Sequence, residues 1–417
     1  MTGNSPALEA SLKRFEGLYP ETIELSLGRI LRALENMGRP QDRLPPVIHV
    51  AGTNGKGSTC AFMRAMAEAA GLSVHVFTSP HLVRFNERIR LAGQLVDDAR
   101  LIGWLDRTHD AIAGGQITHF EATTAAAFLA FSEVPADVLI LEVGLGGRFD
   151  ATNVIDAPAL SVITPVDFDH KAFLGSDLRS IAGEKAGIIK PGRPVVTAIQ
   201  RKVCDEVIAK KAADVKAPLY RLKAHFIDAM PEDLSLIGEH QRANAALAAM
   251  AMQLFGNSTR ISQDAIFEGA RKAEWPARMQ RLKPGPVTAM AEGREVWLDG
   301  GHNPHAARAI ARHLKALGGT TALVTAMLAS KDAVGFFMPF RFLKPPVFTM
   351  PNAPGHRGAD PRDLAEAAHT AGLHATPVDS LAAAMQAAAR SGADRILICG
   401  SLYLAGIVLG ENGEAPV

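Results

Sequence analysis

The strongest chemical signal in the sequence is a glycine-rich loop around a lysine. Residues 52–59 read GTNGKGST and stand between a short β-branched run and an Ala- and Met-rich helical pattern. Glycines let backbone N–H groups turn towards an anion, and the following helix adds the positive end of its dipole. Lys56 can reach the β- and γ-phosphates of a nucleotide, and the Ser58 hydroxyl can bind Mg²⁺. The pattern predicts a phosphate loop; the alternative is a glycine-rich turn with an exposed lysine.

A phosphate loop alone does not identify a reaction, because kinases, hydrolases, ligases and switch proteins all use one. This loop is shorter than the general G-x-x-x-x-G-K-[ST] pattern, and Gly57 stands between Lys56 and Ser58. It therefore indicates a particular subset of ATP-using proteins.

Acidic side chains follow two predicted strands. Glu142 ends the apolar run over residues 137–143, where a carboxylate can hold Mg²⁺ near a γ-phosphate or pair with Arg148. Asp169 and His170 follow the next strand and can serve a metal, orient a water or be structural. In parallel α/β sheets, ligands bind at the carboxyl ends of strands, so these side chains stand where a ligand is expected.

A third polar loop, residues 299–305 (DGGHNPH), follows a strand expected over 296–299. Asp299 can accept the hydroxyls of a ribose, in which case a nucleotide would lie between two domains. Residues 183–187 (GEKAG) read as a further turn, and spacing alone gives Lys185 no role beyond a surface charge pair.

The order of elements indicates what must position these residues. Strand and helix patterns alternate, which predicts an α/β fold with a mostly parallel sheet covered on both faces. The expected helices are 7–37, 58–70, 123–131, 243–254, 262–273, 306–317, 361–371 and 381–389, and the expected strands are 47–50, 73–78, 137–143, 159–164, 195–197, 296–299, 322–326, 347–349 and 395–399. A Pro-Gly-Pro break over 281–286 separates a phosphate-loop domain, residues 1–284, from a smaller Rossmann-like domain, residues 285–417.

Composition excludes several functional classes. The chain has 417 residues, and its formal net charge of +1 argues against a general nucleic-acid binder. Its three cysteines are far apart and match no metal spacing, which favours a reducing compartment. The polar N-terminus lacks a signal-peptide core, and no apolar run is long enough to span a bilayer. We therefore expect a cytoplasmic protein without nucleic-acid or membrane partners.

Several motifs in order resemble those of the folylpolyglutamate synthase and dihydrofolate synthase family, within the Mur ligase superfamily. The matching segments are HVAGTNGKGST (49–59), TSPHL (78–82) with ERI (87–89), EVGLGGRFDATN (142–153), DH (169–170) with LG (174–175), EKAG (184–187), HQ (240–241) with Asn244, WP (275–276) with Arg278, DGGHNPH (299–305) and GSLYL (400–404). The resemblance covers nearly the whole chain.

The resemblance implies a ligase that forms an amide bond with ATP. The γ-phosphate would pass to a substrate carboxylate, the amine of L-glutamate would attack the acyl phosphate, and phosphate would leave. Dihydropteroate, folates and L-glutamate are the implied substrates, ATP and Mg²⁺ the implied cofactors, and a monomer the implied state. Because all three reactants are anionic, cations at the site must offset their repulsion.

The resemblance also assigns roles residue by residue. The nucleotide would bind at Gly52, Thr53, Asn54, Gly55, Lys56, Gly57, Ser58 and Thr59, with Asn244 at the adenine, Asp299 at the ribose, and Arg278 and His302 nearby. One Mg²⁺ would bind Ser58, Ser79 and Glu142, and a second would bind His170. The pterin-bearing substrate would lie near Ser26, Leu27, Gly28, Arg29, Thr118, His119, Phe120, Glu121, Phe149, Asp150 and Ala151. The implied catalytic residues are Lys56, His170, Lys185 and Arg278, and Lys185 matches the lysine that the family carbamylates.

Two positions depart from the family pattern. Ala277 stands where relatives often have a glycine, and residues 171–173 read KAF where relatives often have TDW. Lys171 would add a cation beside the expected second metal.

Three alternatives compete with this interpretation. A related ligase could join an amino acid to another carboxylate. A cell-wall ligase would need a UDP-binding domain ahead of the loop, and the residues before Gly52 are too few for one. A non-catalytic ATP switch would not need Glu142, His170 and Asp299 together. The sequence leaves open whether a family member makes dihydrofolate, extends folates, or does both.

Overall fold

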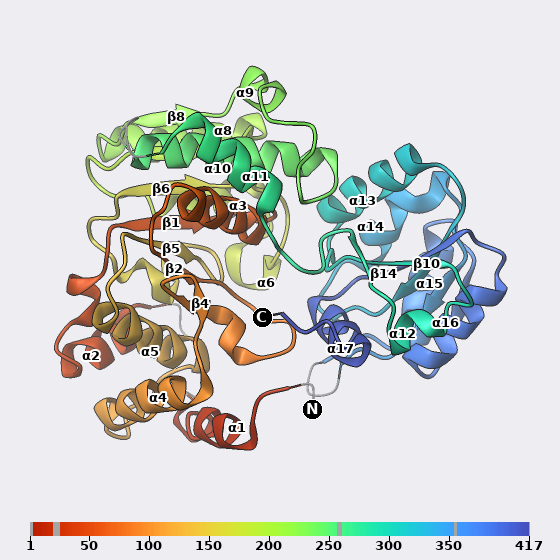
Figure 1. The fold of residues 1–417 in the computed structure, drawn as a ribbon, viewed down its shortest axis with the longest axis horizontal. Helices are drawn as coiled ribbons and strands as arrows, with labels where there is room; N and C mark the ends of the chain where they lie inside the picture. Colours follow the sequence, from red (N-terminus) through yellow and green to blue (C-terminus); the bar gives the residue numbers. More distant parts are fainter. Residues whose placement is uncertain (1–2, 20–25, 257–260, 354–356, 417) are drawn as a thin grey trace.

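Two α/β units lie side by side in the protein, each built on its own sheet (Figure 1). The computed structural model describes residues 3–19, 26–256, 261–353 and 357–416. This arrangement confirms the predicted fold class. None of the helices in these ranges is both long and apolar enough to cross a bilayer.

The sheet of the first unit has the phosphate-loop strand near its centre. Its described strands follow the order β4-β3-β2-β5-β1-β6-β7-β8. Their bounds are β1 Val47–Ala51, β2 Val74–Phe77, β3 Ile89–Leu91, β4 Gln94–Leu95, β5 Val138–Glu142, β6 Leu160–Ile163, β7 Val195–Thr197 and β8 Leu219–Arg221. β1 pairs in parallel with β5 and β6, whereas β3 and β4 pair antiparallel at one edge. The predicted parallel sheet therefore gains an antiparallel edge that the sequence did not indicate.

Helices cover both faces of this sheet, as a parallel sheet requires. Successive residues of β5 point to opposite faces of the sheet. Leu139 and Leu141 pack towards α1, α2, α4 and α5, whereas Val138 and Ile140 pack towards α3, α10 and α11. The bounds are α1 Pro6–Lys13, α2 Gly28–Asn36, α3 Lys56–Ala69, α4 Asp98–Ile112, α5 His119–Glu133, α6 Lys171–Leu174, α7 Leu178–Ala186, α8 Lys202–Asp214, α9 Ala224–Asp228, α10 Glu239–Phe255 and α11 Gln263–Lys272.

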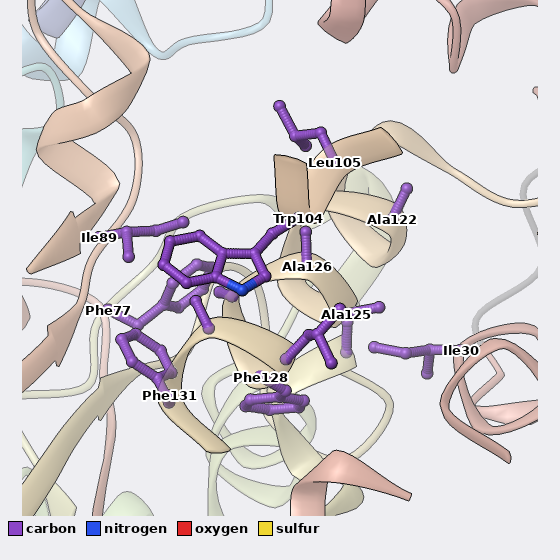
Figure 2. Packing of buried hydrophobic residues seen from close by; sticks show 14 of the residues in the cluster. Ile30, Phe77, Ile89, Trp104, Leu105, Ala122, Ala125, Ala126, Phe128 and Phe131 are labelled. Carbon is purple, nitrogen blue, oxygen red and sulfur yellow. The ribbon is translucent and has the colours of Figure 1, made fainter. Parts of the chain in front are cut away.

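Alanines let these helices pack closely in a chain that is poor in aromatic residues. In the cluster on the α4 and α5 face, Ala122, Ala125 and Ala126 of α5 lie beside larger side chains such as Trp104 (Figure 2). The buried Trp104 indole N–H donates to Glu133 at 2.8 Å, so its polar atom is satisfied. The start of α5 is fixed by a capping box, in which the Thr118 hydroxyl accepts the N–H of Glu121 and the Glu121 carboxylate accepts the N–H of Thr118.

The second unit repeats the alternation around a smaller sheet. Its described strands follow the order β13-β12-β11-β14-β10-β9, and β9 alone among them pairs antiparallel. The strand bounds are β9 Gln280–Arg281, β10 Glu295–Leu298, β11 Thr321–Thr325, β12 Val347–Thr349, β13 Ala375–Pro377 and β14 Arg395–Cys399. The helix bounds are α12 Pro286–Ala289, α13 Pro304–Leu317, α14 Ala333–Phe337, α15 Pro361–Thr370, α16 Leu381–Arg390 and α17 Leu402–Asn412.

Two sequence expectations differ from the structure. The helical stretch expected over 7–37 was wrong as a single element, because α1 and α2 are separate and a short 3₁₀ turn, Glu16–Leu18, follows α1. Gly17 and Pro20 stand between the two apolar stretches and disfavour a continuous helix. The domain division at residue 284 stays a prediction; β9, which precedes it in the chain, belongs to the second sheet.

A segment of the first unit packs into the core of the second. Leu82 and Val83, which follow β2, pack against the cluster that α12, α16 and α17 cover. The approach depends on Gly406 of α17, where an added Cβ would lie 1.9 Å from the Leu82 carbonyl oxygen. Only glycine fits at such a distance.

We expect Gly406→Ala to destabilise the protein. Overpacking against backbone costs about 1–3 kcal/mol, which exceeds the roughly 1 kcal/mol that alanine contributes within a helix. The matched control is Gly103→Ala in α4, where an added Cβ meets nothing within 4 Å. Urea denaturation should give a lower midpoint for Gly406→Ala and an equal or higher midpoint for Gly103→Ala. Equal midpoints for the two variants would contradict the close approach.

Candidate active site

The loops at the carboxyl ends of β1, β5 and β6 meet in one place. β1 leads into residues 52–55, β5 ends at Glu142, and β6 leads into residues 164–170. This confirms that the polar residues after these strands lie at one edge of the sheet. The second unit closes over the same edge, since the side-chain amides of Asn54 and Asn303 exchange hydrogen bonds at 3.0 and 3.3 Å.

Three glycines of the loop stand where a Cβ atom would clash, each with a different neighbour. Gly52 has φ 152°, and an added Cβ would lie 1.8 Å from Thr164 Oγ1. Gly55 has φ 87° beside the Asn244 amide, and a Cβ on Gly57 would meet the Trp275 ring at 2.5 Å. The loop therefore needs these glycines for close approach as well as for conformation.

The backbone of the loop divides into two parts. The N–H groups of Thr53 and Asn54 donate to Pro165 O at 3.0 and 3.3 Å, which ties the loop to the end of β6. α3 begins at Lys56, two residues earlier than the sequence predicted. The first turn of a helix leaves its N–H groups without intrahelical partners, so residues 56–58 present the anion-binding donors.

Two lysines share one backbone acceptor. Lys56 Nζ donates to Gly52 O at 3.2 Å, and Lys185 Nζ donates to the same oxygen at 2.9 Å. Lys185 is buried, and burial followed by the nearby Lys56 charge lowers its pKa to about 7. The turn expected over 183–187 was wrong: Lys185 lies in the last turn of α7, which directs it inwards rather than to the surface.

Glu142 lies beside the loop as a buried carboxylate. Its Oε2 accepts the Ser79 N–H at 3.2 Å, and its Oε1 lies 4.0 Å from Lys56 Nζ. Burial raises the pKa of Glu142 to about 6. The alternative pairing with Arg148 does not form, because that guanidinium lies 3.6 Å from Glu184.

The donors near Glu142 suit Mg²⁺. The Ser58 and Ser79 hydroxyls and the Glu142 carboxylate are hard oxygen donors, and a buried carboxylate gains from a bound cation. The described residues contain no cluster of three His, Cys, Asp or Glu side chains able to form a cage. Mg²⁺ shared with nucleotide phosphates and water needs only one or two carboxylates, so these residues fit it.

Asp169 joins the two units. Its carboxylate accepts hydrogen bonds from Lys331 Nζ at 2.6 Å and from Asn303 Nδ2 at 3.2 Å, and His302 Nε2 lies 3.6 Å away. Burial alone would raise its pKa, but the nearby His302 ring and the Lys331 charge hold the pKa of Asp169 well below its usual range. The adjacent His170, at φ 50°, is more exposed and faces a neighbouring cavity. The side chain of Lys171 lies outside the described part of the chain.

A cavity of about 460 Å³ adjoins Ser79 and His170. Most residues expected at the pterin-bearing substrate line it, namely Ser26, Arg29, Thr118, Phe120, Glu121, Phe149, Asp150 and Ala151. Leu27, Gly28 and His119 do not line it. His119 instead packs edge-on against Phe85, with ring centroids 6.1 Å apart.

The same cavity has walls that sequence reasoning missed. They include Tyr19, Arg88, Phe173, Lys331 and Tyr403. Arg88 and Tyr403 belong to quoted motifs and could have been proposed from them, whereas nothing in the sequence marked Lys331. Tyr19, Phe149 and Phe173 each remain more than two-fifths exposed, which gives the cavity an aromatic rim.

The residues expected at the nucleoside lie between the units. Asp299 is buried and accepts the N–H groups of Met279 and Gly301 at 2.8 and 2.7 Å, so it also fixes the loop that follows β10. Arg278 donates to Ala277 O at 2.8 Å. Ala277 has φ 57°, a conformation that costs a non-glycine residue roughly 1 kcal/mol and that a glycine adopts without this cost.

A second cavity of about 720 Å³ lies on the other side of Glu142. Gly57, Arg278 and Lys283 are among its walls, and it shares Ser79, Pro80 and Leu402 with the first cavity. Ser79 therefore stands where the two cavities meet, and Glu142, which accepts the Ser79 N–H, lines the second cavity beside it.

Comparison with known proteins gives consistent matches. Residues 277–402 match the family described as Mur ligase, glutamate ligase domain. The chain is 38% identical to the dihydrofolate synthase/folylpolyglutamate synthase of Bacillus subtilis, over 74% of this chain and 76% of that protein. It superposes on Mycobacterium tuberculosis folylpolyglutamate synthase complexed with ADP and AMPPCP with a TM-score of 0.86 at 30% identity, covering 98% of this chain and 100% of that one. It superposes on the bifunctional Yersinia pestis enzyme with Mn, AMPPNP and L-glutamate bound with a TM-score of 0.82 at 31% identity, covering 96% of this chain and 97% of that one.

We expect the Lys185 ammonium to make stability depend on pH. In the unfolded chain a lysine holds its proton up to a pH of roughly 10.4, whereas folded Lys185 loses it near 7. Between these values the unfolded state binds more protons, so the free energy of unfolding rises with pH, by up to about 1.4 kcal/mol per pH unit. Chemical denaturation at pH 7, 8 and 9 in CO₂-free buffer should show this slope in the wild type and not in Lys185→Met.

The exposed Lys13→Met is the matched control. Its curve should run parallel to that of the wild type. Parallel curves for the wild type and Lys185→Met would show that Lys185 is not a buried amine of lowered pKa.

Proposed function

The chain belongs to the dihydrofolate synthase/folylpolyglutamate synthase family of Mur ligases, and we propose that it uses ATP to join L-glutamate to dihydropteroate, to the γ-carboxylate of reduced folates, or to both. The reaction transfers the γ-phosphate to the acceptor carboxylate, and the glutamate amine then displaces phosphate from the acyl phosphate. The products are the amide, ADP and phosphate.

The observation that supports this most directly is the position of Ser79 and Glu142. They lie between the 460 Å³ cavity, which takes an aromatic acid, and the phosphate loop. A carboxylate in that cavity and a γ-phosphate at Lys56 would meet at this point. Holding the reactants together in this way supplies much of the acceleration of such a reaction.

Lys56 and the first turn of α3 bind the phosphates and offset their charge, and Arg278 adds a second cation from the opposite wall. Mg²⁺ held by Ser58, Ser79 and Glu142 would neutralise charge that develops between the γ-phosphate and the carboxylate. His170 is the proposed ligand of a second ion. Asn244 contacts the adenine, Asp299 the ribose and His302 the ATP or glutamate.

Lys185 is proposed to be carbamylated. The ammonium first releases one proton. The neutral amine then attacks CO₂, an N–C bond forms as one C–O π bond opens, and a second proton leaves the nitrogen, so that a cation becomes an anion. The lowered pKa supports this step because only the neutral amine is nucleophilic. The carbamate would then attract Mg²⁺ instead of repelling Lys56.

The protein is proposed to act on small molecules as a cytoplasmic monomer. The cysteines Cys60, Cys204 and Cys399 are free and buried, which suits a reducing compartment. The balanced charge suits neither nucleic-acid nor membrane partners.

The test is ATP turnover that depends on both an acceptor acid and glutamate. Purified protein is given dihydropteroate, or a reduced folate monoglutamate, with and without L-glutamate. We expect ADP release only when acid and glutamate are both present. We also expect Lys56→Ala to abolish it and Lys210→Ala, on the exposed face of α8, to leave it unchanged. ATP turnover that needs neither acid nor glutamate would exclude the ligase.

We expect Glu142→Gln to raise the Mg²⁺ concentration needed for half-maximal activity at least tenfold, because the variant loses the carboxylate charge at the proposed metal site. The assay is a Mg²⁺ titration at saturating ATP, acid and glutamate. Glu268→Gln, which removes an exposed carboxylate paired with Lys272, is the control. Superimposable titrations of Glu142→Gln and the wild type would remove Glu142 from the metal site.

A further inference from the structure

A histidine occupies an unusual place in the middle of the central strand. His49 belongs to β1, where its neighbours Ile48 and Val50 are fully buried, and the imidazole itself has no exposed surface. Burial, followed by the charge of Lys190, lowers the pKa of His49 to about 3, so the ring is neutral. A neutral imidazole carries one N–H donor and one acceptor nitrogen.

His49 begins a chain of buried hydrogen bonds that ends at the substrate cavity. His49 Nε2 lies 2.9 Å from Thr152 Oγ1, and Thr152 is fully buried. Thr152 Oγ1 donates to Asp150 Oδ1 at 2.5 Å. Asp150 lines the 460 Å³ cavity. The chain therefore connects the strand that carries the phosphate loop with the wall of the cavity.

The distances fix where the protons lie. Two oxygens 2.5 Å apart need a proton between them, and Asp150 is an acceptor of backbone N–H groups, so the Thr152 hydroxyl supplies that proton. The Thr152 oxygen must then accept from His49, whose Nε2 carries the hydrogen. His49 Nδ1 has no hydrogen-bond partner among the described residues, which fits an unprotonated nitrogen because a buried N–H without an acceptor is more costly.

The Asp150 carboxylate, at the end of this series of hydrogen bonds, also accepts backbone N–H groups. Asp150 Oδ1 also accepts the Thr152 N–H at 3.0 Å, and Asp150 Oδ2 accepts the Leu145 N–H at 2.8 Å. These donors come from the protein side. Asp150 also lines the cavity, whose other walls include the aromatic Phe120 and Phe149.

We propose that His49 and Thr152 are positioning residues that orient Asp150 to accept N–H donors of the pterin ring of the substrate. A pterin carries an amino group and a ring N–H, and a carboxylate in the cavity wall can accept a hydrogen bond from such a donor. His49 acts through Thr152: by occupying the hydroxyl lone pair, it makes the Thr152 proton point to Asp150 and keeps that carboxylate in one orientation. The inference rests on the proposed function.

Two pairs of variants test this. Thr152→Val keeps the shape and removes the hydroxyl, and Thr152→Ser keeps the hydroxyl; His49→Leu removes the donor, and His49→Gln keeps an N–H near the same place. We expect Thr152→Val and His49→Leu to raise the KM for the pterin-bearing acid at least tenfold. The KM for ATP and for glutamate should stay within twofold. In Thr152→Ser and His49→Gln, the KM for the pterin-bearing acid should stay within threefold of the wild-type value.

A merely structural role predicts another pattern. Partial unfolding lowers the active fraction, and with it kcat, while each KM stays the same. An unchanged KM for the acid in Thr152→Val would therefore overturn the proposal. Absence of acid- and glutamate-dependent turnover in the wild type would instead refute the proposed function.

A second measurement does not depend on activity or on the variants folding. ¹⁵N NMR of histidine-labelled wild type reports the tautomer of each ring. We expect His49 to carry its hydrogen on Nε2 and to remain neutral from pH 5 to 8. The hydrogen on Nδ1, or a protonated ring, would overturn the hydrogen-bond chain.

Discussion

One carbonyl oxygen holds the site together. Gly52 O accepts both Lys56 and Lys185, and the oxygen is fixed because Gly52 ends the central strand against Thr164. Burial lowers the pKa of Lys185, and repulsion by the nearby Lys56 ammonium lowers it further. The deeper amine is therefore the one that gives up its proton, while Lys56 stays close to Glu142. The roles of both lysines follow from where one strand ends.

Charge also determines how the two units meet. Asp167 receives Arg201 from its own unit and Arg308 from the other, and Asp169 receives Lys331. These contacts gather around the phosphate loop, which is itself bound through Asn54 to the N-cap of α13. The net charge of +1 thus conceals a local pattern in which Asp167 and Asp169 each face a cation from the second unit. Such contacts are sensitive to salt and to bound anions, as a site for charged reactants needs to be.

The sequence predicted the parts of the site that depend on local pattern. The phosphate loop follows from its glycines between a strand and a helix, and Glu142 follows from its place at the end of an apolar run. Lys185 could not be placed in this way. Its environment is set by α7, which directs the side chain to the Gly52 carbonyl, 133 positions away in the sequence. For Asp169 the sequence left open a metal, a bound water or a structural role. Its nearest partners come from the second unit, and no spacing in the sequence predicts a contact with Lys331. Family resemblance supplied roles that residue patterns alone could not, and the chain from His49 to Asp150 needed coordinates.

The segment that follows β2 has one end in each unit. Ser79 is bound to Glu142 in the first, whereas Leu82 lies against Gly406 in the second. Residues 79–82 therefore connect the two units through a contact at each end. A relative movement of the two sheets would have to be accommodated within residues 79–82 or would change one of these two contacts. If Ser79 and Glu142 bind Mg²⁺ as proposed, the position of one metal ligand and the contact with the second unit depend on the same short segment.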